Sequence, residues 1–141
     1  MSNYLLQDDE LEKLRGKVIL ITGGSTGIGR ATVCLAHSHG AKVAFCDVNV
    51  DVGKAVEQEL KSNIFFQKCD ISNWAEVLSF FQATYDKFGP IDAVIANAGI
   101  NKVESLDDST DGVTVATSDL KAPDISVLNV NLVGTCAMVY W

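Results

Sequence analysis

The chain has 141 residues, of which 48% are hydrophobic, and its net charge at pH 7 is −7. This composition indicates a folded globular protein, and the acidic balance argues against a nucleic-acid partner. The longest uncharged stretch, residues 125–141, is interrupted by polar side chains and is shorter than the roughly 20 apolar residues of a membrane-spanning helix. Because the acidic N-terminus carries no targeting pattern, we expect a cytoplasmic protein without a membrane partner.

Strand-like and helix-like segments alternate along the chain after an acidic lead-in over residues 1–16. Residues 101–122 are polar and acidic and are predicted to form a surface loop. The alternation predicts an α/β fold, a doubly wound parallel sheet of the Rossmann type, in which residues 17–141 form one incomplete domain that stops after the helix following the fourth strand. The predicted strands are 17–22, 42–46, 64–69 and 91–96, and the predicted helices are 27–39, 50–61, 74–88 and a last one from about 123 to the chain end.

Apolar side chains at three- and four-residue steps predict which face of each helix is buried. For the helix over 27–39 they are Ile28, Ala31, Thr32 and Leu35. For the helix over 74–88, which Ser72 or Asn73 is expected to cap, they are Trp74, Val77, Leu78, Phe81, Tyr85 and Phe88.

A glycine-rich turn joins the first predicted strand to the first long helix. Gly23, Gly27 and Gly29 give the spacing G-x-x-x-G-x-G. Glycines allow the backbone to approach a bulky anion closely, and the helix N-terminus then offers unpaired N–H groups. The turn therefore predicts a binding site for the pyrophosphate of a dinucleotide; the alternative is a tight strand–helix turn without a ligand.

Polar residues follow the other predicted strands at the edge where a doubly wound sheet binds ligands. Asp47 lies where an acid would receive the adenosine ribose, and its charge, with no Lys or Arg nearby in the glycine loop, favours NAD over NADP. Asp70 could accept a hydrogen bond from the adenine, with Ile71 nearby. Each acid could instead cap the helix that follows it. The small residues of Asn97-Ala98-Gly99 would admit a ribose, although a bare turn is the alternative.

The four cysteines show no C-x-x-C pair. Cys46 and Cys69 could approach each other on adjacent strands, but buried free thiols are the expected state of an intracellular chain. His37 and His39 do not share a helix face, so no metal site is predicted.

Taken together, these motifs resemble the short-chain dehydrogenase/reductase family. Residues 22–29 match its T-G-x-x-x-G-x-G, residues 96–99 its N-N-A-G with Ala96 in the first position, and residues 129–134 its N-x-x-G helix. The resemblance implies NAD-dependent (less favourably NADP-dependent) oxidation of an alcohol or reduction of a ketone, a possible homo-oligomer, and Asn131 as the catalytic-site asparagine. The implied cofactor-binding residues are Gly23, Ser25, Thr26, Gly27, Ile28, Gly29, Asp47, Val48, Asp70, Ile71, Asn97, Ala98 and Gly99.

The sequence departs from the family in one respect that decides its chemistry. Family catalysis uses a Ser and a Tyr-x-x-x-Lys pair, and no Tyr of this chain has a Lys four positions later. We therefore expect the cofactor-binding half of a dehydrogenase, inactive alone; the alternatives are a non-catalytic NAD-binding regulator and, less favoured, a methyl-donor enzyme. Such a half would leave the fourth strand at an open edge and expose Leu132 and Met138, which predicts association.

Overall fold

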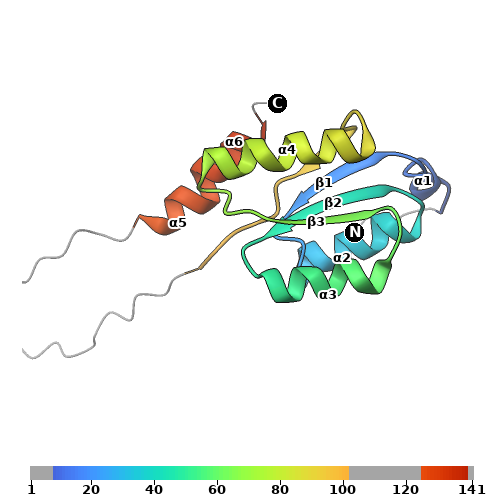
Figure 1. Ribbon diagram of the computed structural model, residues 1–141, viewed down its shortest axis with the longest axis horizontal. Coiled ribbons are helices and arrows are strands. Elements are labelled where there is room, and N and C mark those ends of the chain that lie inside the picture. The colour runs from blue at the N-terminus through green and yellow to red at the C-terminus, as the bar shows by residue number, and fades with distance from the viewer. Residues whose placement is uncertain (1–7, 102–124, 140–141) are drawn as a thin grey trace, which may run out of the picture.

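The computed structural model describes residues 8–101 and 125–139. Four β-strands and three long α-helices alternate in the first of these ranges, and a C-terminal helix with a π-helical middle segment occupies the second (Figure 1). The elements are α1 (Asp8–Glu12), β1 (Val18–Thr22), α2 (Gly27–Ser38), β2 (Lys42–Asp47), α3 (Val50–Leu60), β3 (Ile64–Lys68), α4 (Trp74–Phe88), β4 (Ala93–Ile95), α5 (Ser126–Leu128), the π-helical segment η2 (Asn129–Gly134) and α6 (Thr135–Val139).

The four strands form one parallel sheet in the order β3-β2-β1-β4. β1 is central and pairs with β2 from Val18 opposite Lys42 to Thr22 opposite Cys46. The shorter β4 pairs with β1, with Leu20 opposite Val94. The predicted Rossmann-type α/β architecture is thus confirmed, and all four strands point their carboxyl ends to the same edge.

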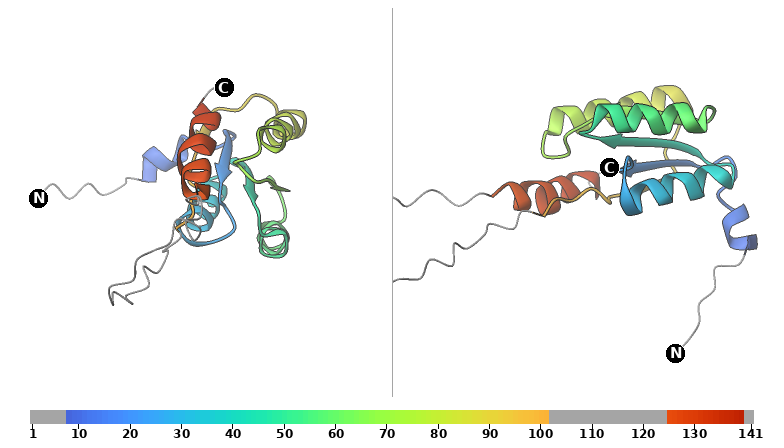
Figure 2. Two further views of the ribbon diagram at one scale, coloured as in Figure 1. Left: turned by 90° about the vertical axis from the view of Figure 1, so that its left-hand side faces the viewer. Right: turned by 90° about the horizontal axis from the view of Figure 1, so that it is seen from below.

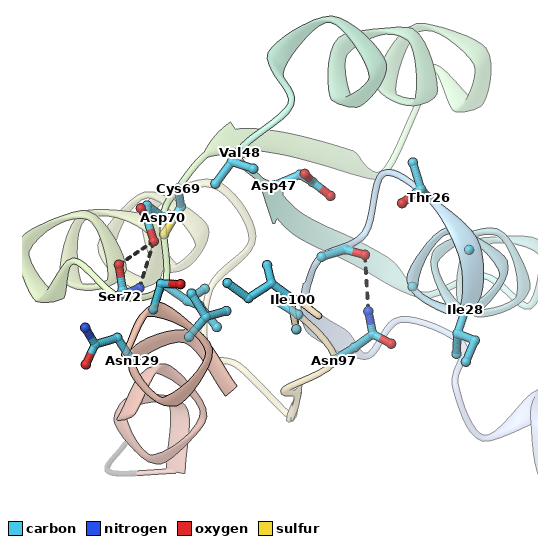
Figure 3. A pocket seen from close by; sticks show the side chains of 18 residues that line it. Thr26, Ile28, Asp47, Val48, Cys69, Asp70, Ser72, Asn97, Ile100 and Asn129 are labelled. Atoms are coloured by element: carbon cyan, nitrogen blue, oxygen red, sulfur yellow. Dashed lines mark hydrogen bonds between the residues drawn. The ribbon is translucent and has the colours of Figure 1, made fainter. Parts of the chain in front are cut away.

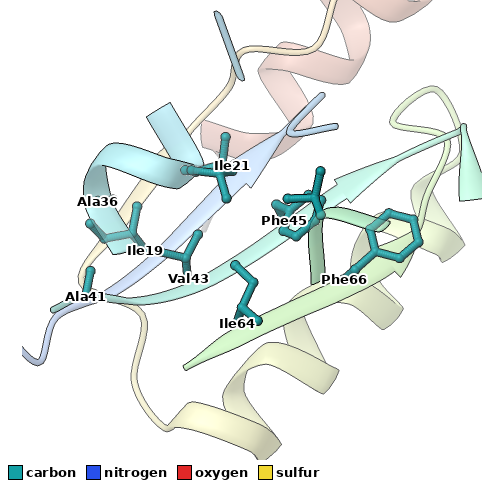
Figure 4. Close-up of a cluster of buried hydrophobic side chains, with 10 residues drawn as sticks. Ile19, Ile21, Ala36, Ala41, Val43, Phe45, Ile64 and Phe66 are labelled. Carbon is teal, nitrogen blue, oxygen red and sulfur yellow. The ribbon is translucent and has the colours of Figure 1, made fainter. Parts of the chain in front are cut away.

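Helices cover both faces of this sheet. α2 and α3 lie on one face, and α4 with the C-terminal helix lies on the other (Figures 1 and 2). Alternate residues of the central strand supply the two cores: Ile19 and Ile21 join the first with Phe45 and Phe66 (Figure 4), whereas Leu20 joins the second with Phe80. Burial of β1 on both faces explains why its sequence is a continuous apolar run.

The predicted buried face of α2 is wrong. Ile28 is 80% exposed and Leu35 is 42% exposed, whereas Gly29, Val33 and Ala36 face the sheet. The reason is the close approach of the helix to the turn that precedes it, since a Cβ on Gly29 would lie 2.0 Å from the Gly23 carbonyl oxygen. Small and β-branched residues therefore face inward, and the larger apolar residues face solvent.

The predicted face of α4 is only partly correct. Val77 and Phe81 are buried as expected, but Phe80 and Thr84 share that face, while Trp74, Leu78 and Tyr85 are exposed. Thr84 satisfies its buried hydroxyl by donating to the Phe80 carbonyl at 2.8 Å, so a polar residue fits the apolar core. Asn73 caps the helix by accepting from the Ala75 amide, as one of the two predicted caps.

Within the described residues β4 forms an edge of the sheet, as expected, and Leu128, Leu132 and Val133 of the C-terminal helix are exposed. The expectation that Met138 is uncovered is wrong, since its side chain is 2% exposed and belongs to the core between the sheet and α4.

Candidate functional site

A cavity of about 760 Å³ opens at the carboxyl edge of the sheet (Figure 3). It collects residues that follow all four strands and three residues of the C-terminal helix. Of the residues implied by the sequence, those that line it are Gly23, Thr26, Gly27, Ile28, Gly29, Asp47, Val48, Asp70, Ile71, Asn97, Ala98 and Gly99. Ser25 and Asn131 do not line it, and the sequence did not indicate Cys69, Ser72, Ile100, Ser126, Asn129 and Val130, which do.

The glycine loop has the form that an anion requires. Gly23 and Gly27 have φ values of +66° and +53°, which residues other than glycine rarely adopt. Thr26 occupies the N-cap of α2, but its side chain makes no hydrogen bond to the first turn of the helix. The backbone amides of that turn are therefore not capped by Thr26. The Ser25 hydroxyl is buried and has no hydrogen-bond partner within the described part of the chain. A loop with an unsatisfied donor and bare helix amides fits a bound phosphate group.

Asp47 is fixed in position at the end of β2. Its carboxylate accepts one hydrogen bond from the Ser25 amide and one from the Asn49 amide, each at 3.1 Å. The alternative in which Asp47 caps α3 is wrong, because Asn49 occupies the N-cap and accepts from the Val52 amide. The carboxylate therefore bridges the glycine loop and the end of β2, with exposed Val48 beside it.

Asp70 follows β3 and accepts hydrogen bonds from the Ser72 hydroxyl at 2.7 Å and the Ser72 amide at 2.9 Å. These bonds, the hydroxyl first, hold the pKa of Asp70 below its ordinary value. Asn73, not Asp70, caps α4. The carboxylate is thus ionised at neutral pH and available as an acceptor in the cavity.

Replacing Ser72 by alanine should raise the pKa of Asp70 towards its ordinary value, because the hydroxyl hydrogen bond that most favours the charged form is lost. A pKa lowered by folding stabilises the folded chain above the unfolded-state pKa, and this contribution disappears as the pH falls through the folded-state pKa. The variant should therefore lose less stability on acidification. An NMR pH titration of the Asp70 carboxyl measures the shift, and Ser79→Ala on α4, outside this contact, is the control. An unchanged Asp70 titration would contradict the assignment.

Asn97 joins the ends of β1 and β4. Its side-chain amide donates to the Thr22 carbonyl at 3.0 Å and to the Gly23 carbonyl at 3.2 Å. Figure 3 shows the second of these bonds. The Thr22 hydroxyl in turn accepts from the backbone amides of Asn97 and Ala98. The side chain of Asn97 therefore holds the glycine loop in place, a use that the sequence pattern did not indicate.

Asn131 lies in the π-helical segment and clamps the backbone of Ile100. Its side-chain oxygen accepts from the Ile100 amide at 2.8 Å, and its side-chain nitrogen donates to the Ile100 carbonyl at 2.9 Å. π-Helical turns often mark functional sites. Here the pair of bonds positions Ile100, which lines the cavity, against the C-terminal helix.

Removing this clamp with Asn131→Ala should speed hydrogen exchange of the Ile100 amide by about thirtyfold, since two hydrogen bonds of roughly 1 kcal/mol each are lost. Asn129→Ala, in the same helix and outside the clamp, should leave that exchange rate unchanged. Equal Ile100 exchange in the wild type and Asn131→Ala would show that the clamp does not hold the loop.

No cluster of His, Cys, Asp and Glu in residues 8–101 and 125–139 has the composition of a metal site. None of the helices in these ranges is long and apolar enough to cross a bilayer.

A model of the short chain dehydrogenase family matches residues 17–140. The chain is 36% identical over 124 residues to (+)-borneol dehydrogenase 1 from Salvia officinalis, and the matched region covers 87% of this chain and 44% of that protein. It is 38% identical over 123 residues to tropinone reductase-like 2 from Erythroxylum coca, and this match covers 87% of this chain and 42% of that protein. The crystal structure of a 3-ketoacyl-(acyl-carrier-protein) reductase from Brucella melitensis complexed with NADH matches with a TM-score of 0.73 and 29% identity, covering 90% of this chain and 49% of that one. The chain thus spans less than half the length of each of these proteins.

Proposed function

The chain belongs to the short-chain dehydrogenase family, and from this premise we propose that the cavity at its sheet edge binds NAD. The pyrophosphate would lie against the glycine loop and the first turn of α2, where Ser25 supplies a hydroxyl without a partner in the described residues. The adenosine ribose would bind Asp47, and the adenine would meet Asp70 and Ile71. This proposal makes residues 17–141 a dinucleotide-binding domain with residues 1–16 as its lead-in.

The position of the Asp47 carboxylate is the single observation that supports the proposed preference for NAD over NADP. Its carboxylate is held by two backbone amides beside the glycine loop, and Gly24, Ser25 and Thr26 place no cation there. A ribose with two free hydroxyls can donate to this carboxylate, whereas a 2′-phosphate would be repelled by it.

For the reaction, we propose that the protein serves the transfer of hydride between an alcohol or ketone and the nicotinamide. The bound dinucleotide supplies the hydride acceptor or donor; the residues of this chain bind and orient it. Asn97-Ala98-Gly99 would border the nicotinamide ribose, and Asn131 would act as a positioning residue through Ile100. The 141 residues contain no Tyr with a Lys four positions later, so we propose that this chain alone binds the dinucleotide without turning it over.

Titration calorimetry with NAD and with NADP tests this function directly. We expect binding of NAD, weaker binding of NADP, and no NADH formation when an alcohol is added to the chain and NAD. A lack of heat with either dinucleotide would exclude the binding proposal. NADH formation by the 141 residues would instead exclude the second candidate function, a non-catalytic NAD-binding regulator, which the missing Tyr–Lys pair favours.

A further inference from the structure

Two cysteines lie at neighbouring strand ends beside the cavity. Cys46 occupies the penultimate position of β2, and Cys69 follows the end of β3. Both side chains are buried in the core between the sheet and α4. Cys46 lies opposite Gln67 in the β2–β3 register, so Cys69, two positions after Gln67, extends to the same face of the sheet. A backbone hydrogen bond holds the ends of β2 and β3 together, because the Cys69 amide donates to the Asp47 carbonyl at 3.1 Å. The remaining cysteines, Cys34 and Cys136, lie on the helices α2 and α6.

The two thiols differ in access and in acidity. Cys69 lines the cavity, where Figure 3 shows it beside Asp70, whereas Cys46 does not line it. The hydrogen bond from Cys46 lowers the pKa of Cys69, and the same contact together with burial raises the pKa of Cys46. Cys69 is therefore the more acidic thiol and borders the cavity, and Cys46 is its protonated partner behind it.

Each cysteine directly precedes an acid that we assign to the dinucleotide. Cys46 is followed by Asp47, and Cys69 is followed by Asp70. A disulfide bond is only about 2 Å long, which is much shorter than a contact between hydrogen-bonded thiols. Forming it would draw the ends of β2 and β3 together and displace both acids.

We propose that Cys46 and Cys69 form a dithiol that peroxide oxidises to a disulfide, and that this disulfide and the bound dinucleotide exclude each other. The second half of the proposal rests on the proposed function. In the first step the Cys69 thiolate attacks a peroxide oxygen, the O–O bond breaks, and Cys69 becomes a sulfenic acid as hydroxide leaves. The Cys46 thiol then attacks that sulfur, forming the S–S bond and releasing water. Overall, one hydrogen peroxide is reduced to two waters and the dithiol is oxidised.

The dithiol is tested by adding graded hydrogen peroxide to the reduced 141-residue chain, blocking the remaining thiols under denaturing conditions, and mapping peptides by mass. We expect a peptide pair linked through Cys46 and Cys69 that reductant releases. In Cys46→Ser the reaction should stop at a Cys69 sulfenic acid that dimedone traps. Recovery of both thiols unmodified, at a peroxide dose that oxidises exposed Cys136, would overturn the proposal; this wild-type measurement needs no variant to fold.

The mutual exclusion is tested by repeating the oxidation with saturating NAD and by titrating NAD into the oxidised chain. We expect saturating NAD to slow disulfide formation and the oxidised chain to bind NAD about tenfold more weakly. Because coupling between two equilibria is reciprocal, saturating NAD should lower the equilibrium constant for disulfide formation by that same factor. Equal NAD affinity of the reduced and oxidised chains would overturn the exclusion. A reduced chain that binds no NAD would overturn the proposed function and the exclusion with it, while the peptide map still decides the dithiol.

Discussion

Replacing Gly29 by alanine should greatly weaken NAD binding and lower the melting temperature of the chain. The added Cβ would lie 2.0 Å from the Gly23 carbonyl oxygen and 2.5 Å from the side-chain nitrogen of Asn97. Both atoms belong to the contact that joins the ends of β1 and β4, so neither can move without opening the loop. The substitution therefore acts on the loop that we assign to the pyrophosphate.

The direction of the stability change in Gly29→Ala distinguishes a packing effect, which destabilises the chain, from helix propensity, which would stabilise it. Alanine is a better helix former than glycine by about 1 kcal/mol, which alone would stabilise α2. Overpacking typically costs about 1–3 kcal/mol, and an overlap with rigid backbone belongs at the upper end of that range. We expect a net loss of about 2 kcal/mol, or roughly 10 °C in melting temperature by thermal denaturation.

Gly16→Ala is the matched control for Gly29→Ala. Gly16 has a φ of +76° and nothing within 4 Å of an added Cβ, so only backbone strain of about 1 kcal/mol applies. This variant should lose some stability and keep the NAD affinity of the wild type. If Gly29→Ala proved as stable as the wild type and bound NAD equally well, the close packing of the loop would be refuted.

The architecture could be predicted from sequence because each strand and helix carries its own period. β1 is a continuous apolar run and α4 has three- and four-residue spacing, so element order and the parallel sheet followed from the pattern. The helix faces could not be predicted as well. A rule that searches for large apolar residues selects Ile28 and Leu35, whereas the close approach of α2 selects Gly29 and Ala36.

In the candidate site, too, the positions of residues could be predicted from the sequence, whereas their hydrogen-bond partners could not. Residues that directly follow strands must lie at one edge of a parallel sheet, so the positions of Asp47 and Asp70 were predictable. Their partners depend on loop conformation. The sequence gives no sign that Asn97 reaches back to Gly23, or that Asn131 clamps Ile100. The sequence predicts only that Cys46 and Cys69 could approach each other, since spacing sets the strand ends but not the face on which each thiol lies; the structure places both in one buried cluster.

The double variant Asp47→Ser/Val48→Arg should reverse the preference of the chain from NAD to NADP. Asp47 supplies the negative charge that repels a 2′-phosphate, and Val48 is 62% exposed at the cavity, where an arginine could reach such a phosphate. Loss of a hydrogen bond to a charged group costs about 1.5–3 kcal/mol, so NAD affinity should fall by roughly 10- to 100-fold. The gain for NADP should be similar, and the affinity ratio should change by at least about two orders of magnitude.

Calorimetric titration of both dinucleotides into each variant measures this ratio. Asp51→Ser is the matched control, because it removes an acid of the same kind from the first turn of α3 and should leave the ratio unchanged. Asp47→Ser alone should weaken NAD binding without creating tight NADP binding, since no cation replaces the lost charge. The amides of Ser25 and Asn49 lose their acceptor in this variant, so its melting temperature must be measured beside its affinity. A double variant that melts like Asp47→Ser and still prefers NAD would show that the ribose does not bind at Asp47, because the charge at that position would then have no influence on the 2′-phosphate.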